Sequence, residues 1–482
     1  MGSGTDKEEY RDLIKYVEGN LAGYAIKSED CTTFIDGTDS VQVYSDMWAS
    51  DNDRYKINNR TPIQHQRDRI LYSHGVRKQA ERYHVLYQGG HRVLRNYITH
   101  TMRMMQVTKS ICRGLRLNQD FAEAIALGSK LGALPFIHAS KGAVSEWMKR
   151  KIIKEDGKRL DYDTTSHTGS LKYSNPNHLP EHPQWIRDIK SKSLRESVEA
   201  NIPFAVGKQV DEPYESGKQG YWLLTTNPYT KQSLPSSFSR EMMFGIWRHS
   251  LNTPVGKDSF RHHQRVDESK LHTIEWNNVS FESIVVQYAD DITWVIENLN
   301  DAHFASPSEH GIFKELLSQS NFEIPMLSNG LSRNDAGVLY TYFINDFIQH
   351  SSKLLQKQDE EFKWRLRGGE EDMAVGLSGE ATNALTEIKS FLFSNVFVEQ
   401  KLEYRTKMLA TISDLCVDLI YENDEYLRHY IDNKATREGW KQMRVRALEL
   451  LNDPVHRIQV AVNIFSELSD QEIFSFIGME SI

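Results

Sequence analysis

A cluster of basic side chains between residues 67 and 78 is the first candidate for chemistry in this chain. Guanidinium groups present paired N–H donors that match the oxygens of a phosphate, so the cluster is a candidate phosphate-binding element. An amphipathic helix with a solvated charged face shows the same pattern, and the residues leave both interpretations open. The cluster consists of Arg67, Arg69, Arg77 and Lys78.

Histidine and cysteine patterns argue against a conventional transition-metal site. His262 and His263 are followed by Asp267, but one such group in a polar stretch is more typical of a solvated surface. The three cysteines lie far apart and form no C-x-x-C pattern. This spacing argues against a thiolate zinc site and suits a reducing compartment, so we expect a cytoplasmic protein.

Composition narrows the class of protein. The charged fraction is 26% and the hydrophobic fraction 39%, which favours a globular chain over a disordered one. The net charge of −8 argues against a wholly basic nucleic-acid surface, although a local basic patch stays possible. No apolar run approaches the roughly 20 residues of a membrane span, and no signal peptide is recognisable. We therefore expect no membrane partner.

Helical periodicity dominates the chain. Apolar residues recur at three- and four-residue steps between about 278 and 302, which predicts one buried helical face. A second such series lies near the C-terminus. The first series is Phe281, Ile284, Tyr288, Ile292, Val295 and Leu299, and the second is Met408, Ile412, Leu415 and Leu419.

Two further helices are predicted around 92–116 and 119–131, separated by a turn at Leu117-Asn118. This division places His100 on one helix and the pair Ser129-Lys130 on the next. The stretch 156–235 is different, because it is rich in proline and in small polar residues and shows no helical period. A segment of this length without regular structure is usually functional or mobile.

Five short segments form a series along the chain, and the tripeptide Asn300-Asp301-Ala302 extends the last one. They are 67–78 (RDRILYSHGVRK), 95–101 (RNYITHT), 127–138 (LGSKLGALPFIH), 245–249 (GIWRH) and 289–294 (ADDITW). In this order they resemble the deoxynucleoside triphosphate (dNTP) triphosphohydrolases of the HD superfamily, a group that includes dGTPases. The family's counterpart of the third segment reads A-H-D-L-G-H-P-P-F-G-H.

The resemblance implies an all-α fold of the HD type. We expect an N-terminal segment at 1–57 and a helical core in two parts, 58–155 and 236–330. Between these parts lies the loop-rich insertion 156–235, and a C-terminal helical subdomain follows at 331–482.

The resemblance also identifies positions that bind a Mn²⁺- or Mg²⁺-like ion in relatives. His100 and Asp290 stand at two of these positions, whereas Ser129 and Lys130 replace the family's adjacent His-Asp pair. An ammonium about 4 Å from a dication is repelled by roughly 8 kcal/mol at an effective dielectric constant near 20. We therefore expect no metal cofactor. The Lys130 side chain either pairs with Asp290 or Asp291, or turns to solvent.

Other positions that face substrate in relatives also differ. Family members carry glutamine, arginine, tyrosine and aspartate where this chain has His84, Tyr97, Trp294 and Asn298. His138 keeps the last histidine of the third segment, which is a general acid/base candidate in relatives. By itself a histidine at a helix end is more often structural.

The resemblance supports three functional hypotheses. The leading one is a pseudoenzyme subunit that binds a dNTP or another nucleotide without cleaving it. The second is an active hydrolase that converts a dNTP to deoxynucleoside and triphosphate with Mn²⁺ or Mg²⁺ held by other ligands. The third is a scaffold, either a homo-oligomer or a hetero-oligomer with an active relative, in which nucleic acid could bind at a subunit interface.

Overall fold

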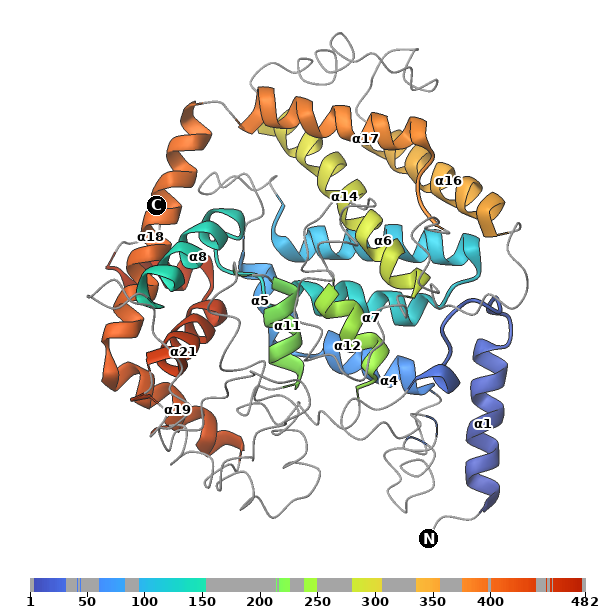
Figure 1. The fold of residues 1–482 in the computed structure, drawn as a ribbon, viewed down its shortest axis with the longest axis horizontal. Helices are drawn as coiled ribbons and strands as arrows, with labels where there is room; N and C mark the ends of the chain where they lie inside the picture. The colour runs from blue at the N-terminus through green and yellow to red at the C-terminus, as the bar shows by residue number, and fades with distance from the viewer. Residues whose placement is uncertain are drawn as a thin grey trace, which may run out of the picture.

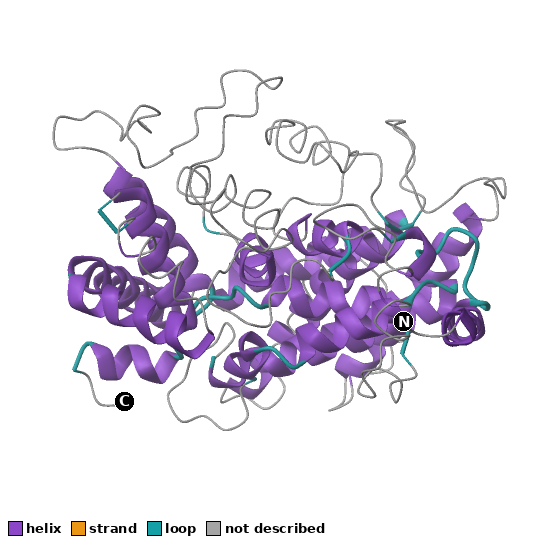
Figure 2. Cartoon of the chain, turned by 90° about the horizontal axis from the view of Figure 1, so that it is seen from below, coloured by secondary structure: helices purple, strands orange, loops and turns teal. Residues whose placement is uncertain are grey.

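The computed structural model describes residues 4–31, 41, 44, 60–82, 95–152, 214, 216–225, 238–248, 280–305, 335–355, 375–397, 400–438, 448, 451–452 and 454–478. Its elements in this part of the chain are all helices, without a strand, which confirms the all-α fold class (Figures 1 and 2). None of the described helices is long and apolar enough to span a membrane.

Helix α7 forms the centre of the larger helical group (Figure 1). Every residue from Phe121 to Lys130 is buried. Gly128 allows this close packing, because a Cβ there would lie 2.4 Å from Ile246 Cδ1. A Cβ on Gly220 would lie 2.3 Å from the Gly128 carbonyl oxygen. The helices around α7 (Gln119–Lys130) are α4 (Pro62–Leu71), α6 (Tyr97–Leu115), α11 (Ser216–Thr225), α12 (Arg240–Arg248) and α14 (Phe281–Ala305).

Asparagine side chains cap the first turns of α6 and α7. Asn96 accepts the backbone N–H of Thr99 at 3.1 Å, and Asn118 accepts that of Phe121 at 3.1 Å. Each asparagine thus caps the first turn of its helix. Between the two helices, Arg116 has φ of 55° and ends α6 in the left-handed region. The second predicted helix and the turn before it are confirmed, whereas the first begins at Tyr97 and not at about 92, because Asn96 is the extended residue that caps it.

A second hydrophobic cluster contains α8 together with the last part of the chain. Helices α16 (Asp335–Leu355) and α17 (Gly379–Phe391), by contrast, pack with α14. They belong to the first hydrophobic cluster, which is the core of the larger helical group around α7. The predicted C-terminal range therefore contributes helices to both clusters, and its boundaries stay a prediction. The second cluster is formed by α8 (His138–Ile152), α18 (Gln400–Glu422), α19 (Asp424–Glu438), α21 (Pro454–Glu467) and α22 (Asp470–Phe476).

The apolar face predicted for α14 is confirmed, but the face predicted for α18 is partly wrong. On α18, Leu415 and Leu419 are 49% and 45% exposed, whereas Cys416 and Ile420 are fully buried. The reason is the packing against α8, where Ser413 Oγ lies 2.6 Å from Ser140 Oγ. Small side chains on this face let the two helices approach closely, and the larger leucines turn outward.

Glu282, the second residue of α14, joins three segments that are distant in sequence. Its Oε1 atom accepts the backbone N–H groups of Ile26, at 3.0 Å, and of Asn118, at 3.1 Å. The side chain is buried, and its Oε2 atom has no hydrogen-bond partner among the residues that the structure describes. Burial raises the pKa of this carboxyl to about 7, although the backbone N–H donors oppose the shift.

We predict that Glu282→Gln removes a pH-dependent loss of stability. An acid whose pKa is raised on folding keeps its proton in the folded state, so stability falls as pH rises from about 4.5 to about 7. Glutamine keeps the acceptor oxygen without ionising. Urea unfolding should give equal stabilities below pH 4.5 and a variant more stable by up to about 3 kcal/mol above pH 7. Parallel pH profiles would contradict the prediction.

Candidate functional site

Three helices bring His100, Lys130 and Asp290 together in the first cluster. The Lys130 ammonium from the end of α7 lies 2.8 Å from both carboxylate oxygens of Asp290 on α14. His100 Nε2 on α6 lies 3.1 Å from Asp290 Oδ1. Of the two alternatives for Lys130, the ion pair is therefore the one observed.

The pair leaves one fixed cation and one anion at the site. Burial lowers the pKa of Lys130, but the attraction of Asp290 outweighs it, so this pKa lies above its ordinary value. Burial lowers the pKa of His100 to about 4, against the opposing effect of the Asp290 hydrogen bond. At neutral pH, Lys130 is charged and His100 is a neutral imidazole.

The residues present do not fit a divalent cation in the arrangement that the resemblance implies. An ion held between His100 and Asp290 would meet the Lys130 ammonium, which already occupies both carboxylate oxygens. Ser129 offers at most a weak neutral ligand, and its hydroxyl donates to the Ala126 carbonyl of its own helix at 2.9 Å. Within the described ranges, no three His, Cys, Asp or Glu side chains are grouped closely enough to hold a metal.

Tyr97 on α6 lies close to the ion pair, whereas Asn298 lies about two helical turns after Asp290 on α14. The Tyr97 ring is buried and lies nearly parallel to the His100 ring, with centroids 5.9 Å apart. Asn298 accepts a hydrogen bond from Arg95 Nη2 at 3.1 Å. The buried guanidinium of Arg95 also lies 3.2 Å from Glu297 and 3.3 Å from Asp301. The asparagine at the family's aspartate position is thus part of a buried polar network.

The sequence reasoning did not select Arg95 or Glu297 for this network. Arg95 begins the second family-like segment, and its place in that segment is the signal that could have pointed to it. Glu297 carries no motif that singles it out. Its carboxylate accepts hydrogen bonds from the Arg103 guanidinium and, at 2.9 Å, from the Tyr340 hydroxyl. These contacts link α14 to α6 and α16.

Trp294 lies one turn after Asp290 and stacks on an aromatic residue that the sequence reasoning missed. The rings of Trp294 and Phe393 lie 5.8 Å apart with an interplanar angle of 29°. Beside them, Lys389 of α17 pairs with Asp291 at 2.7 Å. Phe393 belongs to no periodic apolar series, so only the fold reveals its position.

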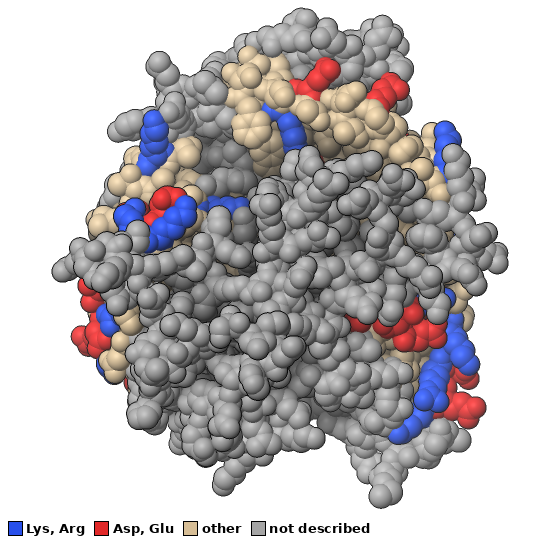
Figure 3. Space-filling model, in the orientation of Figure 1, with Lys and Arg blue, Asp and Glu red and all other residues tan. Residues whose placement is uncertain are grey.

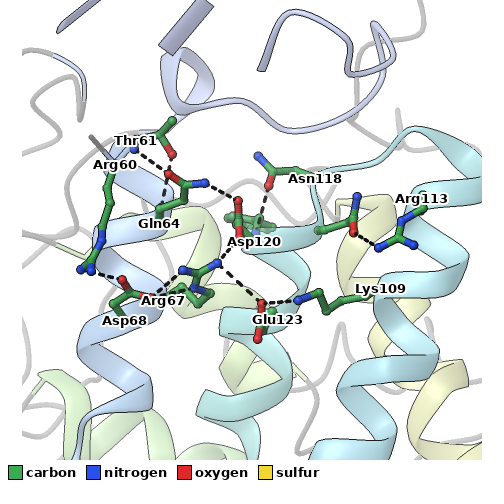
Figure 4. A network of polar contacts seen from close by, with 12 residues as sticks. Arg60, Thr61, Gln64, Arg67, Asp68, Lys109, Arg113, Asn118, Asp120 and Glu123 are labelled. Carbon is green, nitrogen blue, oxygen red and sulfur yellow. Dashed lines mark hydrogen bonds and ion pairs between the residues drawn. The ribbon is translucent and has the colours of Figure 1, made fainter. Parts of the chain in front are cut away.

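The structure separates Arg67 from the Lys130–Asp290 pair. Arg67 lies in a polar network with Asp68, Asp120 and Glu123 near the start of α7 (Figure 4). Glu123 and Lys130 are two helical turns apart, or about 10 Å along α7. The Arg67 guanidinium is thus engaged in joining α4 to α7, which is a structural role.

The other members of the basic cluster differ in their surroundings. The Arg69 guanidinium lies 4.8 Å from the centre of the Phe238 ring. Arg77 is exposed on the short helix α5 (His74–Lys78). This helix packs close to Lys130, because a Cβ on Gly75 would lie 2.9 Å from the Leu131 side chain. Arg77 is therefore the arginine of the cluster best placed to meet a soluble ligand.

His138 begins α8 after a strained turn, and nothing further is described of its side chain. Phe136 and Ile137 both have positive φ, 52° and 40°, which is costly for residues with a Cβ. The turn is held by the second cluster, since Asp470 Oδ1 accepts the Phe136 N–H at 2.8 Å. His84 lies outside the described residues.

Charged side chains on the face shown in Figure 3 occur in groups of both signs rather than in one basic surface, as far as the described residues show. On α8, Lys151 pairs at 2.8 Å with both Asp418 and Glu422 of α18. Basic residues here are matched by carboxylates, so this part of the surface does not favour nucleic-acid binding.

Parts of the chain are similar to proteins named deoxyguanosinetriphosphate triphosphohydrolase-like protein. Over 133 residues it is 33% identical to that of Caldanaerobacter subterraneus subsp. tengcongensis, covering 25% of this chain and 39% of the relative. Over 92 residues it is 39% identical to that of Brucella canis, which covers 19% of this chain and 22% of the relative. It is 38% identical over 90 residues to that of Ralstonia pickettii, which covers 19% of this chain and 23% of the relative.

The matched segments span less than half the length of these relatives. No family model matches the chain. The similarity thus supports the dGTPase-like family for part of the chain, in agreement with the resemblance seen in its motifs.

We predict that the Lys130–Asp290 pair contributes strongly to stability. The Lys130 and Asp290 side chains are 8% and 24% exposed, so the cost of removing Lys130 should lie at the lower end of the roughly 3–5 kcal/mol typical of a fully buried pair. Lys130→Met, which keeps most of the aliphatic volume, should lower the free energy of unfolding by about 3 kcal/mol in urea titrations.

Lys389→Met provides the matched control, because the Lys389–Asp291 pair has side chains 32% and 39% exposed. Its loss should cost no more than about 1 kcal/mol. Equal losses for the two variants would show that burial of the Lys130 pair has no special importance.

Proposed function

We propose that this protein is a dGTPase-like protein that binds a nucleotide and does not cleave it by a metal-dependent route. The observation that carries the proposal is the Lys130 ammonium, 2.8 Å from both oxygens of Asp290. In this role the protein is a nucleotide-binding or regulatory subunit. The relatives' names supply the ligand class, a deoxynucleoside triphosphate with dGTP as the first candidate.

The change of charge supports the loss of catalysis. Metal-dependent hydrolysis requires a cation that neutralises phosphate oxygens and activates water. A lysine ammonium supplies positive charge, but it has no vacant coordination position for water. Held by Asp290 and surrounded by buried side chains, Lys130 is a fixed charge and not a substitute for the ion's chemistry.

The retained arrangement of helices supports nucleotide binding. His100 and Asp290 are in contact, although Ser129 and Lys130 replace the other two metal-binding residues that the resemblance implies. Tyr97, Trp294 and Asn298 lie on the same helices, within two turns of this contact. Substitution at several neighbouring positions with the frame preserved is typical of a rebuilt binding site. The cytoplasm, where dNTPs are made and used, is the proposed location.

A scaffold role is the second candidate, favoured by one observation on α18. Leu415 and Leu419 lie one turn apart and are about half exposed, although both are large apolar side chains. A contact with a second copy, or with an active relative, would cover them. Light-scattering measurements of mass for the wild type and for Leu415→Glu/Leu419→Glu test this role.

We predict that one substitution at Lys130 creates a cation site. Lys130→Asp removes the ammonium and adds a carboxylate beside His100 and Asp290, giving three oxygen and nitrogen ligands. Thermal unfolding with Mn²⁺ should then show a clear metal-dependent stabilisation. Lys130→Asn, which has the same shape without the charge, and the wild type should show none.

We also predict that dGTP stabilises the wild type without being consumed. At about a hundredfold excess over its dissociation constant, a ligand specific for the folded state adds about 2.7 kcal/mol. Arg77→Ala should weaken this stabilisation and leave the unliganded protein unchanged, because Arg77 is exposed. Mn²⁺-dependent hydrolysis of dGTP by the wild type, lost in His100→Ala, would show instead that the protein is an active enzyme.

A further inference from the structure

The turn that joins α7 to α8, residues 131–137, contains two adjacent residues in an unfavourable backbone conformation. Phe136 has φ of 52° and Ile137 has φ of 40°. A β-branched residue such as Ile137 is a rare outlier in this left-handed region, because its side chain crowds the backbone. Such a conformation persists only where surrounding groups hold it. The contacts of the turn therefore identify what opposes its strain.

Helix α22 holds Phe136 both by its backbone and by its side chain. Asp470, the first residue of α22, is buried and accepts the Phe136 N–H at 2.8 Å. One turn later on α22, the ring of Phe474 lies 5.2 Å from the Phe136 ring, measured between centroids. Both contacts are lost if α22 moves away, so the docking of α22 stabilises the strained conformation.

The other end of the turn is joined to Lys130, the last residue of α7. The Lys130 carbonyl accepts the Ala133 N–H at 3.3 Å. The buried Arg82 guanidinium donates to the Ala133 carbonyl. It also donates to the carbonyls of Ser466, at 2.6 Å, and Leu468, at 3.2 Å, which lie just before α22. The segment that leads into α22 and the start of the turn are thus bound to the same side chain.

We propose that α22 is a latch that holds the 131–137 turn in its strained conformation and, through this turn, the Lys130 end of the candidate site. When α22 undocks, Phe136 and Ile137 relax, and the end of α7 loses its connection to the C-terminal helices. Two equilibria that are coupled in this way bias each other equally. A ligand or partner that binds only the undocked α22 therefore also loosens Lys130, and loss of the Lys130–Asp290 pair favours undocking.

Amide hydrogen exchange of the full chain tests the latch, with mass spectrometry of peptides from α22 and from the turn. Ile137→Gly removes the strain, because glycine adopts positive φ without a steric penalty. The docked state is then favoured, and we expect both peptides to exchange about 3- to 30-fold more slowly. Asp470→Ala removes the acceptor for Phe136 and should make both peptides exchange at least about tenfold faster.

Arg116→Gly is the matched control for the glycine substitution. Arg116 also has a positive φ, of 55°, but it ends α6 and donates to the Asn20 carbonyl at 3.0 Å, in the N-terminal part of the chain. Relief of strain at this position should leave the exchange of α22 unchanged. Unchanged or faster exchange of α22 in Ile137→Gly would overturn the latch, because the turn would then store no strain that α22 opposes.

The connection to Lys130 has its own measurement. Lys130→Met should accelerate the exchange of α22 severalfold, whereas Lys389→Met should leave it unchanged, because Lys389 lies on α17 and pairs with Asp291. Exchange of α22 at the wild-type rate in Lys130→Met would overturn this connection. Asp470→Ala would overturn it as well if it accelerated exchange in α22 and not in the turn. These experiments need no nucleotide, so their outcome is independent of the proposed function.

Discussion

The burial of α7 is the constraint on which the site depends. Its residues from Phe121 to Lys130 are buried. A Cβ on Gly128 would meet the Ile246 side chain, and one on Gly220 would meet the Gly128 carbonyl oxygen. A lysine at the end of such a helix cannot reach bulk solvent, so its charge requires a partner within the protein. Asp290 on α14 is that partner, and the ion pair therefore also fixes where α7 ends relative to α14.

The same requirement recurs in the surrounding network. Arg95 and Glu297 are both buried, and their charges are balanced within α6, α14 and α16. Arg82 is buried as well, but it donates to backbone carbonyls, at 2.6 Å to Ser466 and to Ala133 three residues after Lys130. These contacts connect the end of α7 with the C-terminal helices. The site is therefore held by both hydrophobic clusters, and substitutions in either can be expected to affect it.

This organisation supports the proposal that the protein has lost metal-dependent chemistry. The Asp290 carboxylate, which contacts His100 directly, is balanced by the positive charge of Lys130. In relatives, as the resemblance implies, a metal ion has this role, and in this chain Lys130 provides the charge covalently.

The sequence by itself determined the main helices and the positions at which this chain differs from the family that it resembles. Asparagine caps and a 3.6-residue apolar period are local, so α6, α7 and the buried face of α14 follow from a few neighbouring residues. Only the tertiary structure decided which charges meet. Lys130 and Asp290 are 160 residues apart, and the sequence left pairing and solvation equally open. Tertiary packing also engaged Arg67 with carboxylates at the far end of α7, turned Leu415 and Leu419 outward, and placed Phe393 against Trp294. The physical reason is that partners and exposure depend on which helices pack together, and that is a property of the whole chain.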